Sequence, residues 1–131
     1  MAKVLIVEDD KDLNQAYQMI LKRDGHEVFA AHNGKEALKE AQAHTPQLIL
    51  LDLLMPIMDG LEFLKKYDLA KQKDVKVLIF TNMENSPEVN EAYKLGAHRC
   101  IIKSWTAPQN LSHVVREALQ DNPKAASVKG A

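Results

Sequence analysis

Short apolar runs alternate with amphipathic stretches along the chain. Five runs have the length and composition of β-strands. They are Lys3–Val7, Glu27–Ala31, Leu48–Leu51, Val75–Phe80 and Arg99–Ile102. Three of them are almost continuously apolar, which is typical of parallel strands covered on both faces of a sheet. The pattern therefore predicts a parallel sheet between two layers of helices.

The stretches between these runs have helical periodicity. In two of them apolar residues recur at intervals of three and four; they are Leu13, Ala16, Tyr17, Ile20 and Leu21, and Leu111, Val114, Val115, Ala118 and Leu119. Capping boxes at Asn33–Glu36 and Thr106–Gln109, and the pair Ser86-Pro87, indicate three helix starts. Asp24-Gly25 and Leu95-Gly96 indicate two helix ends.

This fivefold strand–helix repeat predicts an α/β fold of three layers, with a five-stranded parallel sheet and helices on both faces. No Gly-x-Gly-x-x-Gly sequence and no Walker motif follows any strand, which argues against a dinucleotide-binding or P-loop protein. We expect one domain over residues 1–121, followed by a polar tail over residues 122–131.

Composition narrows the classes of function. The formal net charge is -1, so the chain lacks the basic character of a nucleic-acid-binding protein. Cys100 is the single cysteine, which excludes an intrachain disulfide. The five histidines show no metal-ligand spacing, and we interpret them as surface or turn residues. No segment resembles a signal peptide or a membrane span. We expect a cytoplasmic protein that binds neither nucleic acid nor membranes directly.

Polar residues follow four of the predicted strands. Glu8 and Asp9 come after the first run, Asp52 after the third, Thr81 after the fourth and Lys103 after the last. The carboxyl ends of parallel strands meet at one edge of the sheet, where α/β proteins bind their ligands. We therefore expect these side chains to converge on one site.

Converging carboxylates repel each other unless a cation lies between them. Mg²⁺ is the expected cation, with Mn²⁺ as an alternative, because it prefers oxygen ligands and keeps water beside one or two carboxylates. Asp9 and Asp52 would bind it together with a backbone carbonyl after Asp52. A metal, a carboxylate, an amine and a hydroxyl are typical of phosphoryl transfer. We interpret Asp52 as the nucleophile, which would become an aspartyl phosphate.

The same residues carry a resemblance to a known family. The matching motifs are Val7–Asp10, Asp52–Gly60 (D-x-x-M-P-x-M-D-G), Phe80-Thr81, Gly96-Ala97 and Ile102-Lys103. The chain resembles the receiver domain of two-component response regulators over about residues 3–119. The resemblance implies a flavodoxin-like (βα)5 fold with strand order 2-1-3-4-5.

The resemblance also implies a role for each site residue. Asp52 would be the phosphoacceptor, Thr81 the switch hydroxyl and Lys103 the salt-bridge partner of the phosphoryl group. The implied magnesium site consists of Asp9, Asp52, the backbone carbonyl of Leu54 and, directly or through water, Glu8. Such a chain is a signalling phosphoacceptor rather than an enzyme, since its only chemistry is self-phosphorylation and autodephosphorylation.

The implied partners are proteins. The phosphodonor would be a histidine kinase or a histidine phosphotransfer protein. A downstream protein would bind the face made by the fourth helix, the fifth strand and the fifth helix, and a phosphorylation-dependent dimer is left open. The chain would be a stand-alone, single-domain response regulator or an excised receiver.

Several positions depart from the family pattern. Cys100 replaces the usual switch aromatic, Asn82 replaces a small residue, and Ser104 replaces a proline that follows the lysine through a cis peptide. These departures keep open a pseudo-receiver that binds proteins without being phosphorylated. A phosphatase of the haloacid dehalogenase type is disfavoured, because it needs an aspartate where Leu54 stands. A flavodoxin-like electron carrier is disfavoured too, because three acids after the first strand would repel a phosphate.

Overall fold

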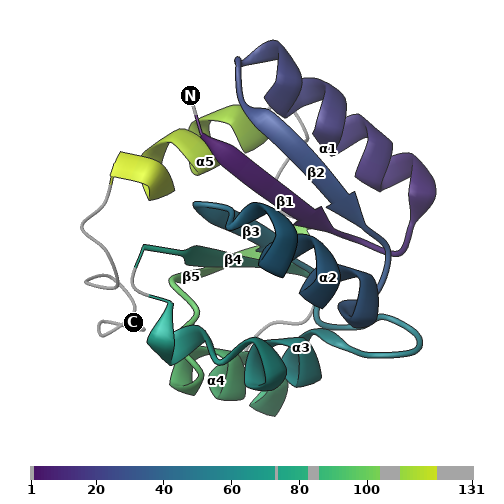
Figure 1. The fold of residues 1–131 in the computed structure, drawn as a ribbon, viewed down its shortest axis with the longest axis vertical. Helices are drawn as coiled ribbons and strands as arrows, with labels where there is room; N and C mark the ends of the chain where they lie inside the picture. The colour runs from purple at the N-terminus through teal and green to yellow at the C-terminus, as the bar shows by residue number, and fades with distance from the viewer. Residues whose placement is uncertain (1, 73, 83–85, 104–109, 121–131) are drawn as a thin grey trace.

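A five-stranded parallel sheet forms the centre of the structure (Figure 1). The structure is a computed structural model and describes residues 2–72, 74–82, 86–103 and 110–120. The strands are β1 (Lys3–Val7), β2 (Glu27–Ala31), β3 (Leu48–Leu51), β4 (Lys76–Thr81) and β5 (Arg99–Ile102). Their order, β2-β1-β3-β4-β5, confirms the prediction.

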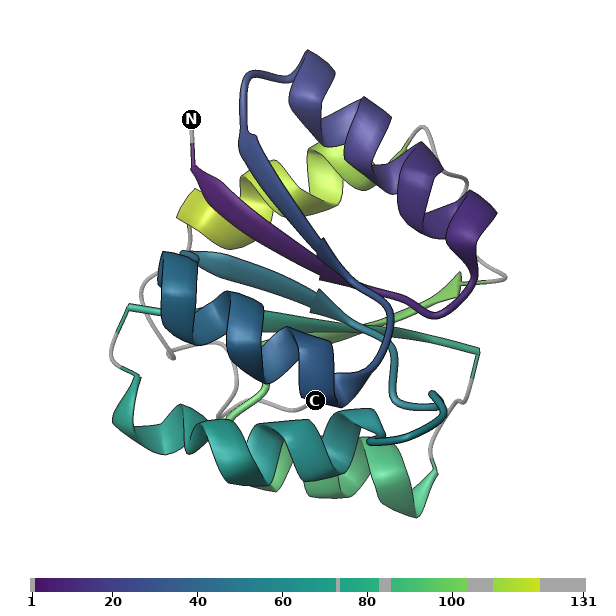
Figure 2. The same cartoon turned by 45° about the vertical axis from the view of Figure 1, so that its right-hand side comes forward.

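Helices cover both faces of the sheet (Figure 2). They are α1 (Lys11–Arg23), α2 (Gly34–His44), α3 (Gly60–Tyr67), α4 (Pro87–Lys94) and α5 (Leu111–Gln120), with a short 3-10 turn, η1 (Leu69–Lys71), after α3. One face carries α1 and α5, and the other carries α2, α3 and α4. The predicted three-layer fold is therefore confirmed. Within the described ranges, no helix has the length and apolar character needed to cross a membrane.

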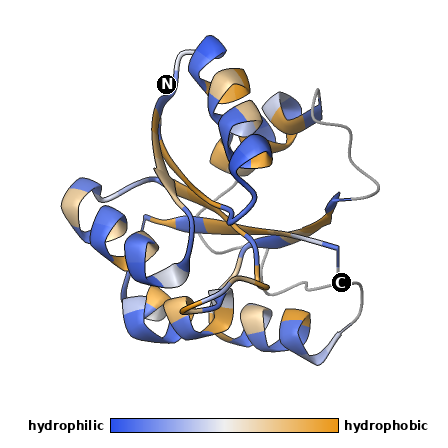
Figure 3. Cartoon of the chain, turned by 90° about the vertical axis from the view of Figure 1, so that its right-hand side faces the viewer, coloured by the Kyte–Doolittle hydropathy of each residue, from blue (hydrophilic) through white to orange (hydrophobic). Residues whose placement is uncertain are grey.

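The alternation of side chains along the strands creates two apolar cores. In β1, Val4 and Ile6 pack in the core beneath α1 and α5, whereas Leu5 and Val7 pack in the core beneath α2, α3 and α4. All four side chains are buried. In Figure 3 the strands are mostly hydrophobic and the outer sides of the helices are hydrophilic. Burial on both faces explains why the central strands are continuous apolar runs.

One strand boundary differs from its prediction. β4 spans Lys76–Thr81 rather than Val75–Phe80, because Thr81 still pairs with the last residue of β5. Lys76 is consequently the first residue of this strand, and it is buried. Its Nζ donates a hydrogen bond of 2.6 Å to the carbonyl of Ala118, near the end of α5. A helix carboxyl end favours a cation, which explains how this ammonium group is accommodated.

Side-chain caps fix the helix starts. Asn33 accepts the N–H of Glu36 (2.9 Å), and Ser86 accepts an N–H in the first turn of α4 (3.2 Å), as predicted. The capping box at the start of α2 differs from the usual arrangement in one detail. The Glu36 carboxylate accepts the N–H of His32 (2.9 Å), whereas in a capping box it would accept the N–H of Asn33. The predicted box at Thr106–Gln109 and the predicted tail lie outside the described residues.

His98 corrects the interpretation of the histidines as surface or turn residues. It lies between α4 and β5, where its side chain is only 3% exposed. Its backbone N–H donates to the carbonyl of Val77 (2.8 Å), which ties the residue to β4 just before β5 begins. Sequence spacing gives no indication of this burial, because the position follows directly on a turn.

Among the described residues, positive φ angles occur at two glycines that follow helices, at the C-caps Thr45 and Asp68 of α2 and α3, and at Ile57 in a loop. Gly25 (φ 92°) and Gly96 (φ 110°) follow α1 and α4, as expected for glycine. Ile57 has φ 69°, which is rare for a β-branched residue. The N–H of Met58 donates to the carbonyl of Pro56 (2.7 Å), so Ile57 is the centre of a γ-turn of the strained type. Its side chain is 77% exposed and gains little from packing.

We expect Ile57→Asn to raise the free energy of unfolding by about 1 kcal/mol, because asparagine adopts a positive φ more readily than a β-branched residue, and a residue held in a sparsely populated backbone region costs about 1–3 kcal/mol. Equilibrium unfolding in urea measures this change. Met19→Asn is the control, since Met19 is also an exposed apolar residue but lies in α1 with helical backbone. An Ile57→Asn protein no more stable than the parent would show that the turn is not strained.

Candidate functional site

The strand register brings the polar residues after β1 and β3 to the same edge of the sheet. Val7 pairs with Leu51 across the two strands, so the residues that follow them, Glu8 and Asp52, are neighbours. The N–H of Asp52 donates to the carbonyl of Val7 (3.1 Å), which extends the pairing by one residue. The carboxyl edge of the sheet is thus where the predicted site lies.

Three carboxylates form a cluster at this edge. Glu8, Asp9 and Asp52 each offer an oxygen, and these oxygens lie within 4.8 Å of one another. Glu8 is 3% exposed and Asp52 is 8% exposed, whereas Asp9 is open to solvent. The convergence predicted from the strand ends is therefore present, with two acids buried and the third at the mouth of the site.

Lys103 bridges the two buried acids. Its Nζ donates to Oδ2 of Asp52 (3.0 Å) and to Oε1 of Glu8. The lysine follows β5, and its side chain is only 13% exposed. When all of these groups are ionised, one ammonium faces three carboxylates. The cluster then keeps an excess of negative charge that a further cation would neutralise.

The ionisation of this pair follows from burial and from the bridge. Burial raises the pKa of Glu8, and the hydrogen bond from Lys103 opposes this effect only in part. Burial alone would lower the pKa of Lys103, but the hydrogen bonds and charges of Glu8 and Asp52 outweigh it and raise that pKa. Lys103 is consequently a cation throughout the physiological pH range.

Backbone donors hold the remaining carboxylate oxygens. The N–H of Leu54 donates to Oδ1 of Asp52 (3.3 Å), and the N–H of Asp10 donates to Oε2 of Glu8 (3.1 Å). Asp10 itself caps α1 by accepting an N–H of its first turn (3.1 Å). The side chain of Leu54 is 60% exposed at the rim of the site. That the Leu54 carbonyl binds a metal stays a prediction.

Thr81 lies on the same edge, at the end of β4 between β3 and β5. It pairs with the residue before Lys103, and its side chain is 1% exposed. Asn82, the next residue, is exposed. The role of Thr81 as a switch hydroxyl stays a prediction. The predictions that concern Ser104 fall outside the described residues.

An aromatic residue that the sequence did not place in the site lies beside Cys100. The N–H of Cys100, in β5, donates to the hydroxyl oxygen of Tyr93 in α4 (2.8 Å). The position expected to hold the switch aromatic is thus occupied by a half-buried cysteine whose backbone is held by a tyrosine from the neighbouring helix. Tyr93 and Cys100 are seven residues apart and lie on different elements, so no sequence pattern predicts this hydrogen bond.

The donor set fits a hard divalent cation. Mg²⁺ takes oxygen ligands, often one or two carboxylates with several waters. The exposed carboxylate of Asp9 gives a hydrated ion access to the cluster, and Asp52 presents oxygens to the same space. The excess negative charge favours such an ion electrostatically. The residues present are therefore compatible with the magnesium site that the sequence predicts.

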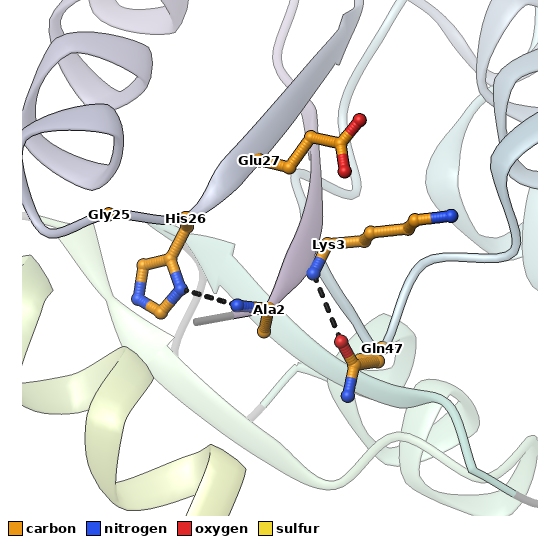
Figure 4. Close-up of a pocket in the computed structure, with 6 residues that line it drawn as sticks. All are labelled: Ala2, Lys3, Gly25, His26, Glu27 and Gln47. Atoms are coloured by element: carbon orange, nitrogen blue, oxygen red, sulfur yellow. Dashed lines mark hydrogen bonds between the residues drawn. The ribbon is translucent and has the colours of Figure 1, made fainter.

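A pocket at the opposite edge of the sheet, where the strands begin, is separate from the acidic cluster (Figure 4). It is lined by Ala2, Lys3, Gly25, His26, Glu27 and Gln47, which lie where β1 and β2 begin and just before β3. The N–H of Ala2 donates to Nδ1 of His26 (3.1 Å), and the N–H of Lys3 donates to Oε1 of Gln47 (3.1 Å). The parallel strands place it a full strand length from the acids.

Gly60 lies tightly against the segment that carries Asp52. A Cβ atom at Gly60 would come within 2.6 Å of the Asp52 carbonyl oxygen and 2.9 Å of the Leu53 Cα. The N–H of Gly60 also donates to the carbonyl of Leu53 (3.0 Å). The first residue of α3 must therefore be glycine for the helix to approach the loop this closely.

We expect Gly60→Ala to lower the free energy of unfolding by about 2 kcal/mol, because backbone atoms cannot move aside as a flexible side chain would. Urea unfolding measures the loss. Lys66→Ala, an exposed change in the same helix, should alter the free energy of unfolding by less than about 0.5 kcal/mol. Equal stability of the two variants would show that the loop relaxes freely.

Known proteins are similar to this chain in sequence and in fold. A family model for the response regulator receiver domain matches residues 4–116. The chemotaxis protein CheY of Listeria monocytogenes is 36% identical over 119 residues, which make up 90% of this chain and 99% of that protein. The alkaline phosphatase synthesis transcriptional regulatory protein PhoP of Bacillus subtilis is 32% identical over 125 residues, or 95% of this chain and 51% of that protein.

Solved structures of receiver-like proteins have a similar fold. The chemotaxis protein CheY4 of Vibrio cholerae superposes with a TM-score of 0.80 and 36% sequence identity, covering 91% of this chain and 99% of that one. The chain spans about half the length of the curated transcriptional regulators that it matches, and nearly the whole length of the two chemotaxis proteins.

Proposed function

The chain belongs to the family of response regulator receiver domains, and we propose that it accepts a phosphoryl group on Asp52 in a magnesium-dependent reaction. Receiver domains are phosphoacceptors of two-component signalling. The assignment of that role to Asp52 rests on one observation. Its carboxylate lies beside Glu8 and Asp9 and accepts a hydrogen bond from Lys103, at the carboxyl edge of a parallel sheet.

In the proposed reaction an oxygen of Asp52 attacks the phosphorus of a phosphohistidine. The new O–P bond forms as the P–N bond breaks, and the imidazole leaves as a neutral ring because its other nitrogen already carries a proton in the donor. Lys103 donates to an oxygen of the transferred group, and Thr81 donates its hydroxyl to another. When bound by Asp9, Asp52 and the Leu54 carbonyl, Mg²⁺ supplies neutralisation of the charge on the phosphoryl oxygens, and Mn²⁺ would do the same. Glu8 belongs to the same acidic pocket.

Receiver domains of this kind interact with histidine kinases and with downstream effectors. For this chain we assign the role of phosphodonor to a histidine kinase or a histidine phosphotransfer protein, in the cytoplasm.

The output face, which would bind the downstream protein, would consist of α4, β5 and α5. The hydrogen bond between Tyr93 and Cys100 supports this face, because it couples α4 to β5 directly. A movement of Thr81 at the end of β4 would reach α4 through the segment between them. The same proposal includes phosphorylation-dependent dimerisation.

The test is the intact mass of the chain after incubation with acetyl phosphate, with Mg²⁺ or with a chelator. We expect the gain of one phosphoryl group with Mg²⁺ and little gain with the chelator. If the mass does not change even at high concentrations of donor and Mg²⁺, the chain is a pseudo-receiver. Its function would then be the binding of proteins in the unmodified state.

A further inference from the structure

A fully buried amide connects the acidic cluster to α1. Asn14 is 0% exposed, on a helix face that is otherwise apolar. Its Nδ2 donates to the carbonyls of Glu8 and Ala31, both at 3.0 Å, and its Oδ1 accepts a hydrogen bond of 2.8 Å from Gln18. Because an unpaired buried amide destabilises the folded state, this set of bonds determines where the side chain lies.

These bonds hold the backbone of Glu8 from both sides. The N–H of Glu8 donates to the same Ala31 carbonyl (3.0 Å), while the Glu8 carbonyl accepts from Asn14. Because the peptide unit is planar, a fixed Glu8 carbonyl also fixes the direction in which the chain continues to Asp9. The backbone N–H of Asn14 then donates to the carbonyl of Asp10 (2.9 Å), which joins α1 to the same segment.

We propose that Asn14 is a positioning residue for the divalent cation of the acidic cluster. It holds the peptide between Glu8 and Asp9 so that both carboxylates face Asp52 before the ion arrives. Gln18 supports it by fixing which end of the amide points toward the two carbonyls. This role deepens the proposed function and rests on it, because it assumes that the cluster binds Mg²⁺.

Residues that orient metal ligands contribute to affinity without touching the metal. Loss of such a residue typically lowers metal affinity by about 10–100-fold. Asn14→Leu keeps the size of the side chain but removes both donors, so the carbonyls of Glu8 and Ala31 lose a partner. Gln18→Leu keeps both donors and removes only the group that orients them. We expect a loss of Mg²⁺ affinity of about tenfold for Asn14→Leu and a smaller loss for Gln18→Leu.

Leu21→Ala is the control for a general loss of stability. Leu21 is fully buried on α1, two turns beyond Asn14, and packs in the core away from the acids. Truncation of a fully buried leucine leaves a cavity and destabilises the folded state, so this variant shows what a loss of stability alone does to Mg²⁺ binding. Its Mg²⁺ affinity should equal that of the parent chain as long as the protein is folded.

The experiment measures Mg²⁺ binding by calorimetric titration of the parent chain and the three variants. Circular dichroism of each sample checks that the protein is folded. Weaker binding in Asn14→Leu with unchanged binding in Leu21→Ala supports the positioning role. Unchanged binding in Asn14→Leu, or equal weakening in Leu21→Ala, overturns it. If Asn14→Leu does not fold, Gln18→Leu decides, and unchanged binding there overturns the role. A parent chain that binds no Mg²⁺ overturns the proposed function itself, and the positioning role with it.

Discussion

Asp52→Asn is expected to abolish phosphoryl acceptance completely. The amide has nearly the same shape as the carboxylate, and its oxygen can still accept the hydrogen bond from Lys103, but its oxygen and nitrogen are poor nucleophiles and form no acyl phosphate. The loss would therefore reflect chemistry rather than folding. Intact mass after incubation with Mg²⁺ and acetyl phosphate measures the outcome, and the parent chain should gain one phosphoryl group under the same conditions.

The matched control for this variant is Asp59→Asn. Asp59 caps α3 by accepting the N–H of Glu62 (2.9 Å), and asparagine is an equally good cap. This variant makes the same acid-to-amide change a few residues away and should be phosphorylated like the parent chain. If Asp52→Asn gained the same mass as the parent, the acceptor would be another residue, and Glu8 and Asp9 would be the next candidates.

The fold and the location of the site could be predicted because they depend on local patterns. An apolar run such as Leu48–Leu51 indicates both a strand and its burial, and the first polar residue after it indicates where the strand ends. Once the strands are parallel, their last residues must meet at one edge. Asp52 and Lys103 could thus be placed near each other although they are 51 residues apart.

The remaining contacts depend on partners that no local pattern identifies. Asn14 interrupts an apolar helix face as a surface residue would, yet it is bonded to the ends of two strands. Lys76 begins a strand as an ordinary polar residue would, yet it reaches a carbonyl 42 residues away in α5. The strain at Ile57 is equally invisible in sequence, because it is set by the turn that joins β3 to α3. Tertiary geometry decides these cases.

Lys103→Met is expected to lower the free energy of unfolding by about 3 kcal/mol near neutral pH in the absence of Mg²⁺. Methionine keeps the length of the side chain and removes its charge, so Glu8 and Asp52 lose the ammonium that bridges them. Removal of one partner from a buried ion pair typically costs about 3–5 kcal/mol, because the remaining charge is uncompensated. The lower end of that range applies here, since Asp9 and the mouth of the site are open to water.

Both pH and Mg²⁺ should change the size of this loss. The pKa of Glu8 is already raised by burial, and it rises further once Lys103 no longer opposes that effect. A carboxyl group with a raised pKa in the folded state binds protons more readily there than in the unfolded chain. The variant therefore regains stability as the pH falls through the raised pKa. At about 100 times the Kd of the variant, Mg²⁺ would stabilise its folded state by about 2.7 kcal/mol, and it would stabilise the parent chain by less, because the Lys103 ammonium repels the ion there.

Urea unfolding of the parent chain and of Lys103→Met, at neutral and acidic pH and with or without Mg²⁺, tests these statements together. Lys66→Met makes the same chemical change on the exposed side of α3 and should shift the free energy of unfolding by less than about 0.5 kcal/mol. If Lys103→Met without Mg²⁺ were as stable as Lys66→Met at neutral pH, Lys103 would not be the cation that compensates the buried acids. If the loss persisted unchanged at acidic pH, its origin would be lost packing, because protonated carboxyl groups no longer need a counter-charge.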